Sequence, residues 1–229
     1  MIPDPRDGWT AEQVREAERP LLAAGVPLMD RAAAGLAAAT EDVLARRGRR
    51  PGRVLVLTGS GSNGGDALLA GALLLDRGCT VVVARLGRRT HAAGLAAAER
   101  AGARVLPPDA SAGRIAAEAA AADVVLDGVL GTGSRGGLRD PAKQVVQRIL
   151  DSAGRRAAVV AVDLPSGVGP DDGVVHPPVL RADVTVTFGG VKAGLLLAPG
   201  RSAAGRVLLV DIGLGAGLAA GRPAVRASR

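Results

Sequence analysis

The sequence predicts an α/β protein in which a doubly wound, mostly parallel β-sheet lies between two layers of helices. Two observations support this fold class. Seven short apolar segments recur along the chain, and several are continuous runs of Val and Leu, which is typical of strands buried on both faces. Ala-rich segments of helical composition separate most of them, and strands that alternate with helices favour a parallel sheet with right-handed crossovers.

The predicted strands are Val54–Leu57, Thr80–Ala84, Arg104–Leu106, Val124–Leu126, Ala158–Val162, Val184–Phe188 and Val207–Asp211. The predicted helices between them are Asp66–Arg77, His91–Ala101, Gly113–Ala122 and Pro141–Ala153. The last two strands follow each other without a helix. We therefore expect them to pair antiparallel or to lie at an edge of the sheet.

Two further helices are predicted ahead of the sheet. Thr10 and Gln13 have the spacing of a capping box, and Pro27 begins a second helical segment that reaches about Arg47. Pro20 is expected to end or kink the first helix, because proline lacks an N–H and clashes with the preceding turn. The pair is interpreted as a lid, an arm or a dimer element. The chain is thus predicted as a single domain, with an N-terminal helical arm (1–50), an α/β core (51–213) and a flexible tail (214–229).

The composition excludes several classes of protein. With 48% hydrophobic and 22% charged residues in 229, the chain is expected to fold rather than to be disordered. The sequence has neither an apolar run of membrane-spanning length nor the start of a secretory signal, so no membrane partner is expected. The single cysteine, Cys79, excludes internal disulfides, favours a reducing, cytoplasmic location and is expected to be a core residue.

The net charge of +7 raises the question of nucleic-acid binding. The chain has no Tyr, one Phe and one Trp, so it lacks the aromatic side chains on which single-stranded bases stack. The many arginines are interpreted mainly as compositional bias, with a secondary role in attracting an anionic substrate. A nucleic-acid partner is not expected.

The first site-like segment is the glycine-rich turn Thr58–Asp66, which follows an apolar strand and opens into a helix. Glycine permits positive φ and close approach to a ligand, and a helix N-terminus attracts phosphate. Gly59, Gly61 and Gly64 have the spacing of a Rossmann-like dinucleotide fingerprint. The acidic residue expected at the end of the next strand is absent, and Arg85 stands there instead. A site for a 2′-phosphate, as in an NADP-dependent dehydrogenase, and a plain glycine-rich turn both remain open.

Three further segments follow predicted strands in the same way: Asp127–Arg139, Asp163–Gly167 and Phe188–Gly194. Asp163 is suited to general acid–base chemistry. If Asn63, Asp127 and Ser166 meet at one end of the sheet, their oxygens suit a weakly charged hard cation better than zinc.

Lys192 is one of only two lysines, and it is interpreted either as functional or as an ordinary exposed residue. His91 and His176 lack metal-binding spacing and are expected at the surface. Ser166 has no surrounding nucleophile elbow, so a hydrolase triad is not expected.

These four segments, in this order and spacing, resemble the NAD(P)H-hydrate epimerase family, whose domain is also called YjeF N-terminal. The family's Asn-Asn-Gly-Gly-Asp loop is similar to Ser62–Asp66, and its Asp-Ala-Leu-Phe-Gly-Thr-Gly loop to Asp127–Gly133. Its Asp-Ile-Pro-Ser-Gly and Phe-Gly-x-x-Lys-x-Gly motifs are similar to Asp163–Gly167 and Phe188–Gly194. The resemblance covers nearly the whole chain.

The resemblance implies a reaction, a cofactor and a site. Such enzymes interconvert the R and S epimers of hydrated NADH or NADPH at C6 of the nicotinamide ring, so that a separate ATP- or ADP-dependent dehydratase restores the cofactor. It implies a potassium ion at Asn63, Asp127 and Ser166. It also implies substrate contacts at Ser62, Asn63, Gly64, Gly65, Asp66, Gly131, Thr132, Gly133, Ser134, Arg135, Gly136, Gly137 and Asp163.

For the chemistry, we expect Asp163 to act as the acid/base, with Lys192 orienting and stabilising. Ser62 departs from the family pattern by replacing the usual first Asn, and it removes an amide that would contact substrate. A homodimer and functional coupling to the dehydratase are expected. The alternatives are a non-catalytic scaffold module of the same fold and an NADP-dependent oxidoreductase.

Overall fold

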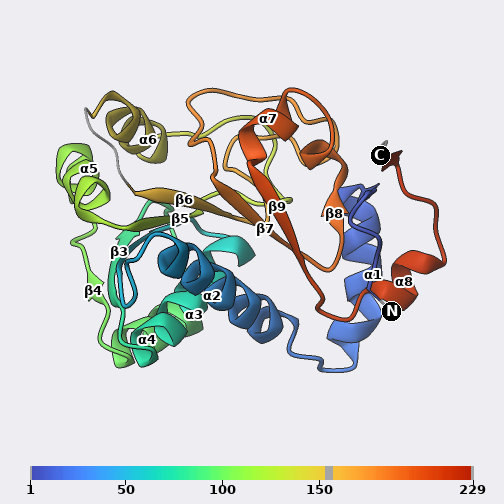
Figure 1. The fold of residues 1–229 in the computed structure, drawn as a ribbon, viewed down its shortest axis with the longest axis horizontal. Helices are drawn as coiled ribbons and strands as arrows, with labels where there is room; N and C mark the ends of the chain where they lie inside the picture. The colour runs from blue at the N-terminus through green and yellow to red at the C-terminus, as the bar shows by residue number, and fades with distance from the viewer. Residues whose placement is uncertain (1, 153–156, 228–229) are drawn as a thin grey trace.

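The computed structural model describes residues 2–152 and 157–227, and within them it shows a three-layer α/β/α fold. Seven parallel strands of the described residues form the central sheet in the order β4-β3-β2-β5-β6-β7-β9 (Figure 1). The strands are β2 (Arg53–Thr58), β3 (Thr80–Arg85), β4 (Arg104–Val105), β5 (Val124–Gly128), β6 (Ala158–Val162), β7 (Val184–Phe188) and β9 (Arg206–Val210). The prediction of a doubly wound α/β sheet is confirmed.

The helices are α1 (Ala11–Ala23), α2 (Leu28–Arg46), α3 (Ser62–Asp76), α4 (Ala92–Arg100), α5 (Ala112–Ala121), α6 (Ala142–Asp151), α7 (Gly200–Ala204) and α8 (Gly215–Ala219), with a 3-10 turn at Ala193–Leu195. The four helices predicted between strands correspond to α3 through α6. The predicted end of α6, Ala153, lies outside the described residues.

The last two strands correct the prediction in one respect. β7 and β9 pair in parallel, with Val184 opposite Arg206, so the antiparallel alternative is wrong, while β9 does lie at the edge of the sheet. The crossover is made by residues 189–205, which contain the short strand β8 (Val191–Lys192) and the five-residue helix α7. Both elements are too short to produce a helical or strand period in the sequence.

Alternate residues of each central strand point into two separate cores. Val54 and Val56 of β2 pack with α2, α3 and α4, whereas Leu55 and Leu57 pack with α5 and α6 on the opposite face. All four of these side chains are at most 1% exposed. This burial on both faces explains why the strands are continuous apolar runs. Cys79 is buried in the first core, as expected.

The N-terminal helices confirm two predictions and correct a third. Thr10 caps α1 through a capping box with Gln13, and α2 follows Pro27. Pro20, however, lies inside α1, which continues to Ala23. Only the final turn follows this proline, so a single helical hydrogen bond is lost there and the helix ends soon afterwards. No single helix of the described residues is long and apolar enough to cross a membrane, although α1 and α2, bent by 118°, pass that test as a pair.

A second, three-stranded sheet joins segments that are far apart in the sequence. β1 (Asp7–Trp9) pairs in parallel with β8 and antiparallel with β10 (Val225–Arg226), and Trp9 lies opposite Lys192. The residues after position 214 therefore form α8 and β10 rather than the flexible tail that we expected, as far as residue 227. Figure 1 shows both chain ends on the side of the molecule where α1, α8 and β8 lie. This small sheet fixes the N-terminal arm against the turn that carries Lys192.

The order of the strands creates a switch point between β2 and β5. The chain builds β3 and β4 on one side of β2 and then returns to place β5 on its other side. Open α/β sheets bind ligands at the carboxyl ends of the strands beside such a point. Here the N–H of Gly59 donates to the carbonyl of Gly128, with an N–O distance of 3.0 Å, so the two loops leave the sheet side by side.

Candidate functional site

A large cavity, called here the main cavity, opens at the carboxyl edge of the sheet. Its volume is about 1000 Å³. Its wall is formed by α1, the turn after β2, residues 86–88 after β3, nearly all of residues 129–142 after β5, and the carboxyl ends of β6 and β7. The described strands that flank the switch point thus contribute to one concave site, the usual location of a small-molecule site.

The glycine-rich turn in this wall is the first turn of a helix. α3 begins at Ser62, four residues earlier than predicted, and its N-cap Gly61 supplies no side-chain hydrogen bond. The N–H groups at this helix start therefore lack a side-chain cap on the cavity side, which suits a phosphate group. Ser62 and Asn63 line the cavity.

None of Gly59, Gly61, Gly64 and Gly65 has positive φ, and all but Gly61 are closely packed. A Cβ on Gly59 would lie 1.9 Å from the carbonyl oxygen of Val129, and one on Gly64 would lie 2.5 Å from the carbonyl oxygen of Gly59. Gly64 and Gly65 are buried beneath the turn and do not line the cavity, so their substrate contact stays a prediction.

Asp163 and Lys192 form a buried ion pair in the cavity wall. The ammonium of Lys192 donates to Oδ1 of Asp163 and to the carbonyl of Phe188, the latter at 2.9 Å. Oδ1 also accepts hydrogen bonds from Thr187 Oγ1 (3.0 Å) and the N–H of Phe188 (3.3 Å). Lys192 is 2% exposed, so the interpretation of an ordinary exposed lysine is wrong.

The backbone of Asp163 is unusual as well. Its φ is +66°, and within the described residues it is the only non-glycine residue with positive φ. Non-glycine residues in this region are uncommon, and strained backbone of this kind concentrates at functional sites. Oδ2 of Asp163 has no hydrogen bond within residues 2–152 and 157–227, so it remains free to accept one from a ligand.

Asp66 adds a second carboxyl group to the same cavity. It is 6% exposed, and its carboxyl has no hydrogen bond or ion pair within the described part of the chain. Burial, together with the negative charges of Asp163 and Glu18, raises the pKa of Asp66 to about 8, although the Lys192 ammonium opposes this shift. Burial also raises the pKa of Glu18, which reaches the cavity from α1. At neutral pH Asp66 is therefore mainly protonated.

Asp127, Ser166 and Asn63 meet directly beneath the cavity. Asp127 accepts hydrogen bonds from Ser166 Oγ (2.6 Å) and Ser166 N (2.9 Å). Asn63 donates from Nδ2 to the carbonyl of Val162 at 2.6 Å, and the N–H of Leu130 donates to Ser166 Oγ at 2.8 Å. Asp127 and Ser166 are thus in direct contact, whereas Asn63 is linked to Ser166 through the backbone of Leu130, to whose carbonyl its Nδ2 donates at 3.4 Å.

This group has the chemistry of a site for a monovalent cation. Asp127 is 1% exposed and has no cationic partner among the described residues, and burial raises its pKa. The carboxylate accepts hydrogen bonds from the hydroxyl and N–H of Ser166 and from the N–H of Val129. Carboxylate and hydroxyl oxygens suit a hard cation better than a soft one. The described residues contain no cluster of three or more His, Cys, Asp or Glu side chains that could hold a metal ion.

The second glycine-rich loop forms the outer rim of the cavity. Gly131 packs on Asn63, where a Cβ would lie 2.2 Å from Oδ1, and Ser134 Oγ donates to the Gly131 carbonyl at 2.6 Å. Thr132, Gly133, Ser134, Arg135 and Gly137 line the cavity, whereas Gly136 does not.

Comparison with known proteins identifies the family. Residues 25–194 match the family described as YjeF-related protein N-terminus. The chain belongs to this family. The NAD(P)H-hydrate epimerases of Clavibacter michiganensis subsp. michiganensis and Microbacterium testaceum are each 49% identical to it, covering 97% and 96% of this chain and 96% and 84% of those proteins.

A longer relative and a solved structure are also similar to this chain. The bifunctional NAD(P)H-hydrate repair enzyme Nnr of Mycobacterium tuberculosis is 41% identical over 91% of this chain and 42% of that protein. The crystal structure of the yeast protein YNL200c matches with a TM-score of 0.72 at 21% identity, covering 88% of this chain and 86% of that one. The latter likeness supports the fold.

Some residues that line the main cavity were not predicted from the sequence. Val14, Arg15 and Glu18 of α1 line the main cavity, as do Leu86 and Arg88. The spacing of Val14, Ala17 and Glu18 marks one face of a helix, but it does not tell what that face covers.

The two histidines also differ from expectation. His91 and His176 are both partly buried rather than freely exposed. His91 caps α4 through Nδ1 and packs against Gly65. The cap on the first turn of α4 gives His91 a structural role.

Proposed function

We propose that the protein is an isomerase that interconverts the R and S epimers of hydrated NADH and NADPH at C6 of the nicotinamide ring. The observation that carries this proposal is the main cavity, which joins an uncapped helix start suited to phosphate with a buried acid–base cluster. The relatives that align over nearly their full length are named NAD(P)H-hydrate epimerase. The main cavity also places the carboxyl groups of Asp66 and Asp163 beside the ammonium of Lys192, which supports an acid–base reaction.

Epimerisation at C6 needs the bond from C6 to its hydroxyl oxygen, or to the ring nitrogen, to open and close again. A proton must reach the departing oxygen or nitrogen and be removed when the bond reforms. Two carboxyl groups with opposite protonation are the usual means of supplying such a proton and accepting it. Asp66 and Asp163 line the same cavity and supply two carboxyl groups for these steps.

We assign the proton-accepting role to Asp163 and the proton-donating role to Asp66. Lys192 donates to Oδ1 of Asp163, which fixes this carboxyl group in the cavity wall and leaves Oδ2 for substrate. Asp66 retains its proton at neutral pH because of its burial and its acidic neighbours. The buried ammonium of Lys192 also fixes the position of the Asp163 carboxyl through its hydrogen bonds to Oδ1 and to the carbonyl of Phe188.

A potassium ion is part of the proposal. Asn63, Asp127 and Ser166 would hold it, and it would supply fixed positive charge beneath the cavity. Asp127 is ready for such an ion, because its buried charge has no other cationic partner in the described residues. These three residues also tie the loops after β2, β5 and β6 to one another, so they position the cavity floor.

The product of this reaction feeds a dehydratase that accepts the S epimer. The M. tuberculosis relative is named a bifunctional repair enzyme, and the present chain aligns with less than half of it. We therefore propose functional coupling to a separate dehydratase. The proposed homodimer and cytoplasmic location remain predictions.

The decisive experiment supplies R-NADHX, an S-specific dehydratase and ATP or ADP, and follows recovery of NADH by absorbance. The protein should speed recovery well beyond spontaneous epimerisation. Recovery at the spontaneous rate would leave a non-catalytic scaffold as the better explanation. Hydride transfer to a carbonyl substrate, measured with NADPH, tests the oxidoreductase alternative in the same preparation.

A further inference from the structure

A smaller cavity, called here the side cavity, lies next to the main cavity. Its volume is about 220 Å³, and it is formed by residues 84–86 at the end of β3, residues 106–112 and Ile115 around the start of α5, and Pro141, Gln144 and Val145 at the start of α6. Leu86 and Pro141 line both cavities. The two cavities are therefore neighbours, with Leu86 and Pro141 at their common boundary.

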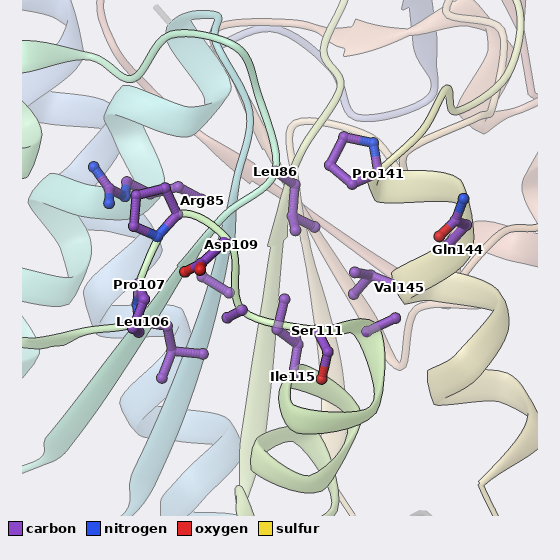
Figure 2. Close-up of a pocket in the computed structure, with 14 residues that line it drawn as sticks. Arg85, Leu86, Leu106, Pro107, Asp109, Ser111, Ile115, Pro141, Gln144 and Val145 are labelled. Atoms are coloured by element: carbon purple, nitrogen blue, oxygen red, sulfur yellow. The ribbon is translucent and has the colours of Figure 1, made fainter.

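The side cavity has an apolar floor and a polar rim. Figure 2 shows Leu86, Ile115 and Val145 around the hollow, and these side chains are 5%, 3% and 2% exposed. Gln144 and Asp109 lie at the rim and are exposed. The carboxamide of Gln144 has no hydrogen bond within residues 2–152 and 157–227. Apolar walls with a few polar groups at the edge suit a flat heteroaromatic ring.

The position of the side cavity in the sheet agrees with this chemistry. In doubly wound sheets the pyrophosphate of a dinucleotide lies on the first glycine-rich turn, and its ribose reaches toward the end of the second strand. Here that turn follows β2, and the second strand is β3, which ends at Arg85. The N–H of Leu86 donates to the carbonyl of Thr58 at 2.8 Å, so the entrance to the side cavity is held beside the turn.

The acid–base cluster sets the direction in which a dinucleotide lies. Asp163, Lys192 and Glu18 belong to the side of the main cavity formed by β6, β8 and α1, whereas Leu86 belongs to the side formed by β3. The ring that reacts must be placed beside the cluster. The other base of the same molecule then lies beyond the glycine-rich turn, toward the side cavity.

We propose that the side cavity binds the adenine ring of hydrated NADH and NADPH, with Gln144 hydrogen-bonded to the edge of the base. A carboxamide matches the donor and acceptor pair that adenine presents. This inference rests on the proposed function for the identity of the substrate. The site itself binds an adenine nucleotide whether or not the protein catalyses the reaction.

Direct binding of ADP-ribose tests the site without catalysis. Gln144→Ala removes the edge contact, Val145→Phe fills the hollow, and Gln147→Ala is the matched control, since Gln147 lies on the same helix but lines neither cavity. Calorimetry should show that Gln144→Ala weakens ADP-ribose binding about tenfold, as expected for one lost hydrogen bond. Val145→Phe should weaken it further, and Gln147→Ala should leave it unchanged. Wild-type affinity in both Gln144→Ala and Val145→Phe would overturn the proposal, as would failure of the wild-type protein to bind ADP-ribose.

Kinetics on two substrates separates this proposal from the proposed function. With hydrated NADH, Gln144→Ala should raise KM about tenfold and leave kcat near the wild-type value. With hydrated nicotinamide mononucleotide, which has no adenosine, wild type and Gln144→Ala should behave alike. An equal rise in KM for both substrates contradicts an adenine site. No epimerisation by the wild-type protein contradicts the proposed function, and the ADP-ribose titration then decides the adenine site alone.

Discussion

The ammonium of Lys192 donates to the carboxylate of Asp163, and the two residues are brought together from positions 29 residues apart in the chain. Their side chains are only 2% and 7% exposed. A buried ion pair of this kind contributes little to net stability, because both charges have lost their hydration. Its placement in the wall of the main cavity therefore indicates a chemical role.

Lys192→Met should damage both activity and folding. The substitution leaves Asp163 as a buried carboxylate without its partner, which costs about 3–5 kcal/mol of unfolding free energy. Urea denaturation measures this loss, and the NADHX assay measures the rate. Lys143→Met is the matched control, because Lys143 is the only other lysine and is exposed. Equal stability and activity in the two variants would show that the ion pair has no role.

Asp163→Asn should reduce kcat while the fold is kept. The amide fills the same volume but accepts a proton far less readily, so the rate should fall about 10²- to 10⁴-fold, the usual contribution of general acid–base catalysis. Asp76→Asn, an exposed position on α3, provides the control. Epimerisation by Asp163→Asn at the wild-type rate would remove Asp163 from the mechanism.

Asp66 should give the enzyme an alkaline limit. Its pKa of about 8 means that the proposed proton donor ionises as the pH rises through that value, so the rate should fall above about pH 8. Asp66→Asn should lower the maximal rate and abolish this alkaline decrease. A pH–rate profile from pH 6 to 10 measures both effects. If the rate of Asp66→Asn fell at the same alkaline pH as that of the wild type, the decrease would belong to another group.

The same carboxyl should affect stability with a definite sign. In the unfolded chain an aspartate titrates near pH 3.9, whereas folded Asp66 holds its proton up to about pH 8. The contribution of this raised pKa to the free energy of unfolding is fully present below about pH 3.9. It is lost progressively as the pH rises, until the folded carboxyl ionises near pH 8. Stability of wild type relative to Asp66→Asn should therefore decline between these limits. A difference that grows with pH in this window contradicts the assignment.

Most of the fold could be predicted from the sequence because a strand that is buried on both faces is a continuous run of apolar residues. Val54–Leu57 and Ala158–Val162 are apolar at every position, and both are central strands. β1 and β10 have three and two residues, too few to show a strand period, so the small sheet was missed. The supposed flexible tail is ordered by partners that lie almost the whole chain length away.

The site was predictable where ligand residues follow strands, and less so where tertiary packing decides. Asn63, Asp127 and Ser166 meet because parallel strands end at a common edge. The early start of α3 was missed because Gly64 and Gly65 disfavour a helix on intrinsic propensity, and contact with Gly59 and His91 overrides that preference. The role of Glu18 was missed because no local pattern reveals which cavity a helix covers.

Gly59 and Gly61 should respond very differently to alanine. A Cβ on Gly59 would meet the Val129 carbonyl, so Gly59→Ala must push apart the two loops at the switch point. This should lower the free energy of unfolding by about 1–3 kcal/mol. Nothing lies within 4 Å of a Cβ on Gly61. Gly61→Ala therefore alters only the N-cap of α3 and should lower the free energy of unfolding by about 1 kcal/mol or less. Urea denaturation of both variants tests this contrast. Equal destabilisation would mean that conformational freedom, rather than close packing, explains these glycines.

Potassium should stabilise the folded protein through Asp127. An ion that binds only the folded state adds about 2.7 kcal/mol when its concentration is 100 times its Kd, so Tm should be higher in KCl than in NaCl of equal ionic strength. Asp127→Asn removes the single carboxylate of the site and should abolish the difference between the two salts, whereas Asp76→Asn should keep it. Thermal unfolding measures this without reference to activity. If Asp127→Asn retained the full potassium-specific increase in Tm, the ion would bind elsewhere, and the buried carboxylate would be held only by the hydrogen bonds from Ser166 and Val129.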